Sequence, residues 1–492
     1  MLHSENFDEK ILDKHVIDTI KEDFKSFNMQ MDVHFAHVIM LYEQNIITKQ
    51  EAGSILGALF EIENNGPESI PIKEGLTDLY SNLEEFIVNK IGIEVGGKLH
   101  IARSRNDMNI TIERMFTRDS LIKYVDALIY LMETLLVEAE KHKNTIIPGY
   151  THHSQHAQPT TLGHFYLNFF HTFKRDIERA EASYKHSNIC SMGGAALTTT
   201  GFPINRQRVS ELLAFIKPVE HSMDATSSLD FQYESASAMA IFINNVGRMI
   251  ESLLLWNIRE VGLVRLALKY CSYSTIMPQK RNPVALETLR YSGEWTYGAL
   301  STMFNTLKAF TPGNGREPGF VTSLYMEISE KIIPSIYLLE GIVRTLEVNK
   351  ERGLEITKEG FSTMTELADE LVRSKNLSFY AAKKIVGKLV VIAHDEKIPC
   401  EKIDSNLIKR AAREALNIEV ELEEEKIKTA IDPEKNIQER DIMGGPAVTE
   451  TERMVKEGKD YIEQMRNKWT EIRNTLEKSH ENLRNLAKEI IG

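Results

Sequence analysis

The stretch LIKYVDALIYLMETLLVEAE, residues 121–140, decides the fold class. Its apolar residues lie alternately four and three positions apart, which is the spacing of one face of a long helix packed against other helices. They are Leu121, Val125, Leu128, Met132, Leu135 and Ala139. Neither Gly nor Pro occurs between Gly97 and Pro148, so we predict a long uninterrupted helix in this part of the chain.

The same spacing returns three times further along the chain. The repeats run through residues 166–184, 239–256 and 332–346, and stretches that contain Gly or Pro separate them. Four such helices predict a central bundle. Their length predicts apolar surface beyond the needs of one chain, and therefore self-association; a longer monomeric bundle is the alternative.

The chain on either side of the bundle is less regular. Short helical patterns and a break rich in Gly and Pro at residues 66–71 predict a small N-terminal domain, residues 1–110. The bundle is assigned to residues 111–360. Residues 361–492 are assigned to a C-terminal domain that closes with an amphipathic helix from Thr449 onward. The chain is thus predicted to be all-α, with three domains.

Composition excludes several classes of protein. The 492 residues carry 59 Lys and Arg against 71 Asp and Glu, so no overall basic field favours nucleic acid or an anionic membrane. Cys190, Cys271 and Cys400 lie too far apart for a Cys-x-x-Cys pair, and we interpret them as reduced thiols in a cytoplasmic protein. The first ten residues are acidic where a signal peptide is apolar, so we expect no targeting to or through a membrane.

Three polar segments lie before or between the predicted helices. Residues 272–283 crowd hydroxyl groups, two cations and two prolines together, which suits a small anion as well as an ordinary polar connection. Residues 103–107, Arg-Ser-Arg-Asn-Asp, suit carboxylate recognition but also helix capping. Residues 148–159 include His152 and His156, which are four positions apart. No Glu lies between them and no Cys lies nearby, so the sequence does not favour a zinc site. An imidazole that moves a proton, or that simply packs in the fold, is the better interpretation.

Together, and in this order, these segments resemble the aspartase/fumarase superfamily, and more closely the argininosuccinate lyase family. Residues 274–283 match the superfamily signature Gly-Ser-Ser-x-Met-Pro-x-Lys-x-Asn-Pro, with Tyr273 in place of its Gly and Thr275 in place of its second Ser. Gln279 is the argininosuccinate lyase form, whereas Arg281 is more similar to adenylosuccinate lyases. Further matches lie at residues 96–107, 148–152, 202–204, 222–225 and 361–388.

The resemblance implies a homotetrameric lyase that eliminates fumarate from an N-substituted aspartate, most simply argininosuccinate. It implies no metal and no organic cofactor, while the net charge already argues against a nucleic-acid or membrane partner. In this family each active site combines segments from different subunits. The matching catalytic residues are Ser274 as the base, His152 or His153 as the acid, Lys280 and Glu287; the matching substrate-binding residues are Ser104, Arg105, Asn106, Thr151 and Asn282. One extra residue between Pro148 and Pro159 leaves the choice of histidine open, with His152 favoured.

Two departures from the family pattern leave the leaving amine open. Residues 314–322 lack the Tyr, Gln and Lys that contact the amino-acid end of the substrate in the family. His34 stands where the family often has Ser in a Ser-x-Ala-His pattern. A site that hydrogen-bonds a polar group of its substrate strongly rejects substrates without that group, so these changes could alter which amine is accepted. The same elimination on another aspartate–amine adduct is therefore a second hypothesis. A catalytically silent structural member of the fold is a third.

Overall fold

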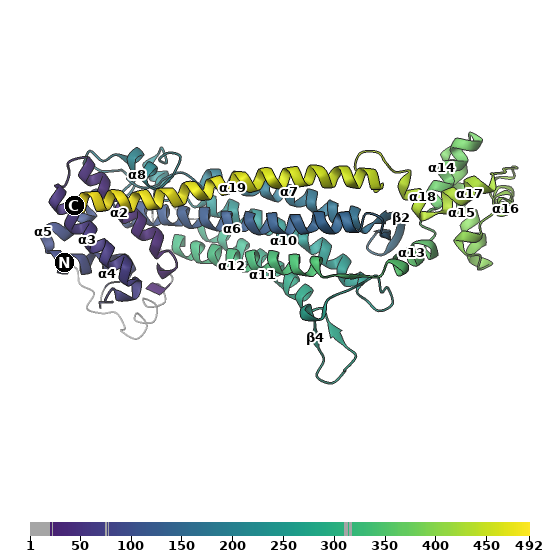
Figure 1. The fold of residues 1–492 in the computed structure, drawn as a ribbon, viewed down its shortest axis with the longest axis horizontal. Helices are drawn as coiled ribbons and strands as arrows, with labels where there is room; N and C mark the ends of the chain where they lie inside the picture. The colour runs from purple at the N-terminus through teal and green to yellow at the C-terminus, as the bar shows by residue number, and fades with distance from the viewer. Residues whose placement is uncertain (1–19, 22, 74–75, 77, 309–312, 314–316) are drawn as a thin grey trace.

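Helix α6 is the central helix of the molecule, and it runs without a break from Arg105 to Lys141 (Figure 1). The computed structural model describes residues 20–21, 23–73, 76, 78–308, 313 and 317–492. At a rise of 1.5 Å per residue, α6 is about 55 Å long. All six residues of its predicted apolar stripe, from Leu121 to Ala139, are 0% exposed, which confirms the helix and its buried face.

Four further long helices of the described chain pack with α6 or with one another to form the bundle. They are α7 (Leu162–Ser187), α10 (Asp230–Trp256), α11 (Val284–Leu307) and α12 (Glu317–Arg344). Helices α7, α10 and α12 carry the three predicted repeats, so the bundle is confirmed. The sequence spacing does not predict α11, because its buried face includes Ser292 and Thr296 in place of large apolar residues.

Helix α10 is long and apolar enough, by those two criteria alone, to cross a membrane. Half of its most apolar window is buried inside the protein. Its side chains Met239, Phe242 and Val246 belong to the core of the bundle. We therefore attribute the hydropathy of α10 to packing among helices.

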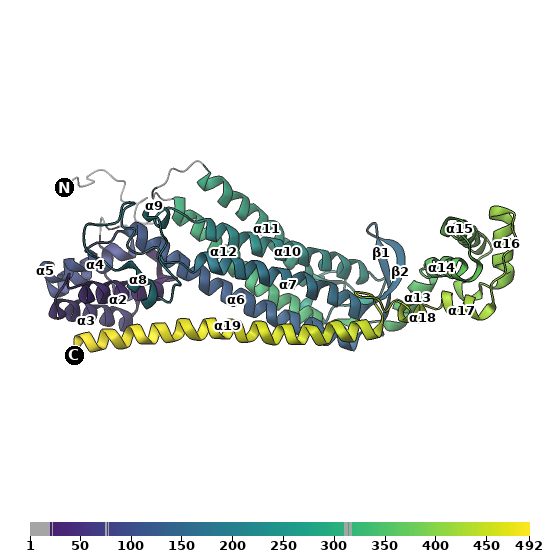
Figure 2. The same ribbon diagram turned by 90° about the horizontal axis from the view of Figure 1, so that it is seen from above.

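The N-terminal helices form a second apolar core at one end of the bundle (Figures 1 and 2). These elements are α2 (Phe27–Glu43), α3 (Lys49–Asn65), a 3₁₀ turn (Pro67–Ser69), α4 (Leu79–Ile91), α5 (Ile93–Gly96) and a second 3₁₀ turn (Gly97–His100). The same core includes the start of α6, the short helix α8 (Arg206–Leu212) and the end of α19 (Val448–Ile491).

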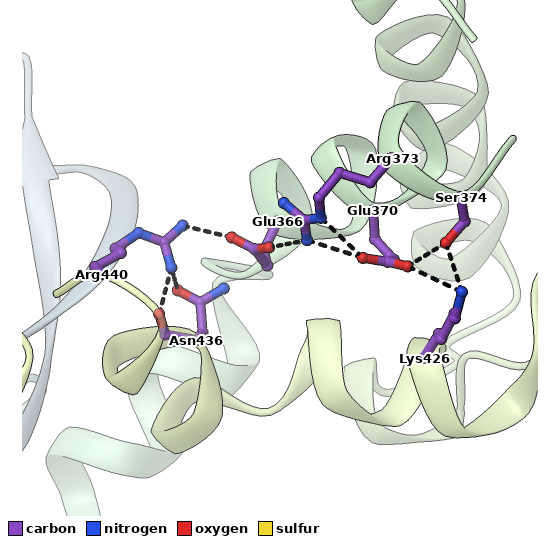
Figure 3. Close-up of polar contacts among 7 residues, drawn as sticks. All are labelled: Glu366, Glu370, Arg373, Ser374, Lys426, Asn436 and Arg440. Carbon is purple, nitrogen blue, oxygen red and sulfur yellow. Dashed lines mark hydrogen bonds and ion pairs between the residues drawn. The ribbon is translucent and has the colours of Figure 1, made fainter. Parts of the chain in front are cut away.

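At the other end, where buried residues between Leu367 and Ile431 form a third apolar core, the described elements are short helices. They are α13 (Lys350–Glu359), α14 (Met364–Lys375), α15 (Phe379–Asp395), a 3₁₀ turn (Cys400–Lys402), α16 (Ser405–Leu416), α17 (Glu424–Ile431) and α18 (Pro433–Gln438). The buried carboxylate of Glu366 ties α14 to the segment after α18, because it contacts Arg373 at 2.5 Å and Arg440 at 3.1 Å (Figure 3).

Helix α19 leaves this third core and runs back along α6 and α7 to the N-terminal helices (Figures 1 and 2). The closing amphipathic helix predicted from Thr449 is thus present, and its 44 residues pack with the bundle and the first helices. The domain limits at residues 110 and 360 stay a prediction, and α6 crosses the first of them without a break.

The remaining described elements are a short helix, a 3₁₀ turn and three antiparallel two-stranded ribbons. They are α9 (Ser222–Ala225), a 3₁₀ turn (Leu268–Tyr270), β1 (Ile146–Thr151) with β2 (Gln155–Thr161), β3 (Val264–Arg265) with β6 (Glu347–Val348), and β4 (Ser272–Tyr273) with β5 (Arg281–Asn282). The first and third ribbons carry two of the three polar segments that the sequence singled out.

Candidate active site

The segment 103–107 forms the start of α6. Ser104 is the N-cap: its hydroxyl oxygen accepts the Asn106 N–H at 3.4 Å, while Asp107 Oδ1 accepts the Ser104 N–H at 2.9 Å. The other Asp107 oxygen accepts the N–H groups of Gly193 and Ala195 at 2.8 and 2.9 Å. Burial raises the pKa of Asp107, although these backbone donors act in the opposite direction. The segment is therefore fixed to the 193–195 loop behind it.

The two arginines of this segment point to different surroundings. Arg103 is buried, and its guanidinium donates to Nδ1 of His34 at 2.9 Å and to the Tyr80 hydroxyl at 3.3 Å. Arg105 is at the surface and forms an ion pair with Asp78. The start of a long helix also carries partial positive charge, so this end of α6 is suited to an anion.

The histidines of the second segment lie at the tip of the β1–β2 hairpin. His152 and His153 are exposed and adopt positive φ values of 49° and 69°. The Thr151 hydroxyl lies 3.3 Å from Nδ1 of His152. A bulge at Gly149 precedes the tip, and a side chain there would meet the Gln158 carbonyl oxygen at 2.5 Å. The hairpin thus presents both imidazoles to solvent.

His156 lies in a different environment from these two histidines. Its ring packs against Tyr150, with 5.1 Å between the ring centres, and a Cβ at Gly360 would lie only 1.9 Å from it. Burial lowers the pKa of His156. His156 is exposed overall, and these ring contacts distinguish it from His152 and His153. Within the described ranges, no three His, Cys, Asp or Glu side chains gather as a metal site requires.

The third segment forms the β4–β5 ribbon and its tip, which project from the side of the bundle (Figure 1). The Ser274 hydroxyl oxygen accepts two backbone N–H groups, from Met277 at 3.1 Å and from Ile276 at 3.4 Å. The tip is folded by a hydrogen bond from the Lys280 N–H to the Met277 carbonyl at 3.0 Å. Ile276 is 83% exposed, so the ribbon contributes little to the core of its own chain.

Two further predicted residues flank this ribbon. The Asn282 side chain donates to the Ser272 hydroxyl at 3.4 Å across the two strands. Glu287 lies in the first turn of α11 and is exposed. Both positions place polar groups at the base of the loop that carries Ser274.

The structure brings the predicted site residues together in three groups, and the groups stay apart within one chain. Ser104, Arg105 and Asn106 lie at the start of α6, whereas the His152 hairpin follows its other end, about 55 Å away by helix length. The ribbon of Ser274 projects separately from both (Figure 1). Of the segment 314–322, residues 314–316 lie outside the described residues, and Glu317 to Thr322 begin α12.

Comparison with known proteins identifies the family. A lyase family model matches residues 5–294, and an argininosuccinate lyase C-terminal model matches residues 361–438. The argininosuccinate lyase of Methanocaldococcus jannaschii is 38% identical over 434 residues, which cover 88% of each chain. That of Methanosarcina mazei is 35% identical over 482 residues, 98% of this chain and 96% of the relative. The chain belongs to the argininosuccinate lyase family. It is a carbon–nitrogen lyase of the aspartase/fumarase superfamily.

Solved structures of related lyases agree with this family assignment. An EDDS lyase in complex with formate is 30% identical and superimposes with a TM-score of 0.88, covering 95% of this chain and 92% of that one. A class II fumarase from Schistosoma mansoni, at 16% identity, has a TM-score of 0.69 over 84% of this chain and 90% of its own. The second likeness shows the shared fold.

Proposed function

We propose that this lyase cleaves argininosuccinate into arginine and fumarate, as a cytoplasmic homotetramer that needs no metal or organic cofactor. The curated relatives that match nearly the whole chain carry the name argininosuccinate lyase. The net charge of −12 favours neither nucleic acid nor an anionic membrane as a partner. A small dianionic product then requires a local group of cations and N–H donors, which the start of α6 offers.

The observation that carries the proposal is the environment of Ser274. A serine hydroxyl is a weak base unless its deprotonated form is stabilised. The N–H groups of Ile276 and Met277 already point at the hydroxyl oxygen, and the Lys280 ammonium belongs to the same short loop. Ser274 is therefore suited to remove the proton that lies alpha to a carboxylate and beta to the departing nitrogen.

The elimination then proceeds without external reagents. The electron pair of the broken C–H bond forms the double bond of fumarate, and the C–N bond breaks. Lys280 stabilises the additional negative charge on the carboxylate in the intermediate. His152, or His153, gives a proton to the leaving nitrogen, and the carboxylate of Glu287 orients the imidazole.

The remaining predicted residues hold the fumarate half of the substrate. Ser104, Arg105 and Asn106 lie at the helix start, where N–H groups and a guanidinium suit one carboxylate. We assign Thr151 and Asn282, from the two ribbons, to the other polar contacts. When substrate binds, the Arg105 guanidinium either leaves Asp78 for the substrate carboxylate or contacts both carboxylates.

A homotetramer is proposed because a single chain leaves the three groups apart and leaves apolar surface exposed. Large apolar side chains with at least 40% exposure lie on α10, α11 and α12: Ile241, Tyr291, Tyr297, Phe304, Phe320 and Tyr337. Packing these helices against other copies would cover them and bring segments of different chains together. Light scattering coupled to gel filtration tests the assembly, and a monomer as the active species would contradict it.

The identity of the leaving amine has a second candidate. The similar structure at 30% identity is named an EDDS lyase, and a variant of that enzyme is described with bound fumarate. In this chain α12 begins with Glu317, Pro318 and Gly319, in the segment that departs from the argininosuccinate lyase pattern. An aspartate adduct of another amine is therefore the alternative substrate.

The deciding experiment measures fumarate absorbance after the pure protein is mixed with argininosuccinate, adenylosuccinate or other aspartate adducts. We expect release from argininosuccinate. Release from a different adduct alone would select the alternative amine. A folded tetramer that releases fumarate from none of them would favour a catalytically silent member of the fold.

A further inference from the structure

The Arg103 guanidinium is buried, and none of its partners among the described residues is a carboxylate. The residue is 5% exposed, and its guanidinium donates to His34 and Tyr80 rather than to a described Asp or Glu. Asp107 is near enough to be influenced by the charge of Arg103, but its oxygens bind backbone N–H groups instead. Arg373 and Arg440 at the other end of the molecule both contact the Glu366 carboxylate (Figure 3). A buried charge that no partner cancels is costly, so the surroundings of Arg103 need an explanation.

His34 is the main partner of Arg103, and its chemical form follows from that contact. A guanidinium carries only donors, so Nδ1 of His34 must accept at the observed 2.9 Å and cannot carry a proton. Burial lowers the pKa of His34 well below its ordinary value, and the charge of Arg103 acts in the same direction. His34 is 0% exposed. It is therefore a neutral imidazole with its proton on Nε2.

Tyr80 completes the surroundings of the guanidinium. Its ring lies under Arg103, 5.2 Å from the guanidinium carbon to the ring centre. Its hydroxyl oxygen accepts from Arg103 at 3.3 Å and lies in hydrogen-bond contact with Nδ1 of His100. Each of these partners binds the guanidinium and none cancels its charge.

Arg103 immediately precedes the residues that are proposed to hold the substrate carboxylate. The chain is fixed on one side by Arg103 in its His34 and Tyr80 contacts, and on the other by Asp107. Between them lie Ser104, Arg105 and Asn106. The guanidinium of Arg103 thus adds a positive charge next to the helix start, held by the acceptors His34 and Tyr80.

We propose that His34 is a positioning residue for the carboxylate-binding segment 104–106: as a neutral acceptor it fixes Arg103 and leaves the guanidinium charge to act on the bound dicarboxylate. The proposal rests on the proposed function, since it needs a dicarboxylate at this segment. It gives the departure from Ser at position 34 a physical role that the sequence alone does not reveal.

Three substitutions at position 34 separate anchoring from charge. In His34→Asn an amide oxygen replaces Nδ1 as a neutral acceptor, so fumarate affinity should stay within about threefold of the wild type. His34→Leu removes the acceptor, and we expect the Kd for fumarate and the KM to rise about tenfold, with a smaller change in kcat. His34→Asp keeps an acceptor but adds a negative charge, so it should bind fumarate about tenfold more weakly while the fold stays at least as stable.

Arg118 offers the matched control on the same helix. It is also buried, and its partners among the described residues are Asn188 and the Leu213 and Ala214 carbonyls, none of them a carboxylate. Arg118→Met should lower the melting temperature and leave fumarate affinity unchanged, because this arginine lies about four helical turns from Ser104.

The readouts are calorimetric titration of the full-length assembled protein with fumarate, steady-state KM and kcat, and the melting temperature. Wild-type affinity in both His34→Leu and His34→Asp would overturn the positioning role while the proposed function stands. Equal loss of affinity in His34→Leu and Arg118→Met would overturn it too, as a general effect of stability. A wild type that neither binds nor releases fumarate would overturn the proposed function itself. If His34→Leu does not fold, the comparison of His34→Asp with His34→Asn decides.

Discussion

The two ends of α6 carry parts of the same proposed site and are built in opposite ways. At its start, Arg103 and Asp107 are buried and bonded on both sides of Ser104, so the backbone that faces the substrate is held in place. After its other end, His152 and His153 lie on an exposed hairpin tip, and within the described chain few contacts hold them. The Ser274 ribbon is equally exposed.

This difference suggests that the proposed binding residues and the proposed proton-transfer residues are held in different ways. The segment proposed to bind a carboxylate is preformed inside one chain, where neutral acceptors and backbone donors fix it. The residues proposed to move protons lie on ribbons that one chain leaves exposed, and in the proposed tetramer they would gain neighbours from other chains. Substitutions at the two kinds of region should therefore affect different kinetic constants.

The largest effect is expected at the exposed ribbon. Ser274→Ala removes the proposed base, so kcat should fall at least about a thousandfold while fumarate affinity is retained. Ser104→Ala, at the start of α6, should instead raise KM by roughly tenfold. Fumarate release and fumarate titration measure both variants. A Ser274→Ala enzyme with wild-type turnover would contradict the base assignment.

The next effect sharpens the choice between the two hairpin histidines. Replacing the acid should lower kcat about a hundredfold, because protonation of the leaving nitrogen is lost. We expect this loss in His152→Asn, and a small change in His153→Asn. The reverse order would transfer the role to His153. Full turnover in both single variants would remove the acid from this hairpin.

Mixing variants tests whether the Ser274 ribbon and the start of α6 meet across chains. Ser274→Ala and Arg105→Ala are each expected to be nearly inactive. If one site takes these residues from different chains, random co-assembly leaves roughly a quarter of the sites with both intact, and activity returns. The mixture is unfolded, refolded together and assayed for fumarate release, with each variant treated alone as the control. No recovery in verified mixed assemblies would mean that one chain supplies both residues.

The sequence predicts the long helices well because their apolar spacing is local information. Leu121 to Ala139 need only a 3.6-residue period to be recognised, and the structure buries all of them. The spacing does not find α11, where Thr296 and Ser292 pack in the core. The ribbons are also not predicted, since the short strands of β4 and β5 pair across a loop and leave little periodic signal.

For the site, the sequence supplies candidate residues but not their surroundings. Asp107 follows Ser104 by three positions, which is a recognisable capping pattern. The contact of His34 with Arg103 joins positions 69 residues apart and follows from the tertiary fold. The pairing of Arg105 with Asp78 has the same origin, so single-sequence reasoning does not reveal it.

The last comparison concerns stability, and its effects differ in sign between the two ends of α6. Near its start, burial raises the pKa of Glu113 to about 8 from 4.5. At its other end, burial lowers the pKa of His142 to about 4 from 6.5. Both groups are held neutral in the folded protein.

The raised pKa of Glu113 means that its stabilising contribution is complete below about pH 4.5 and is lost as the pH rises toward 8. The depressed pKa of His142 gives a contribution that is present above about pH 6.5 and is lost as the pH falls toward 4. Each pH unit of these windows is worth at most about 1.4 kcal/mol.

Glu113→Gln should therefore flatten the loss of stability between pH 5 and pH 8, and His142→Asn should flatten the loss between pH 6.5 and pH 4. Urea unfolding at fixed protein concentration measures both, because assembly also contributes to stability. Each variant is the control for the other, since general destabilisation would shift both curves evenly across pH. If Glu113→Gln loses stability with rising pH as steeply as the wild type, the assignment of a neutral Glu113 carboxyl near the start of α6 is wrong.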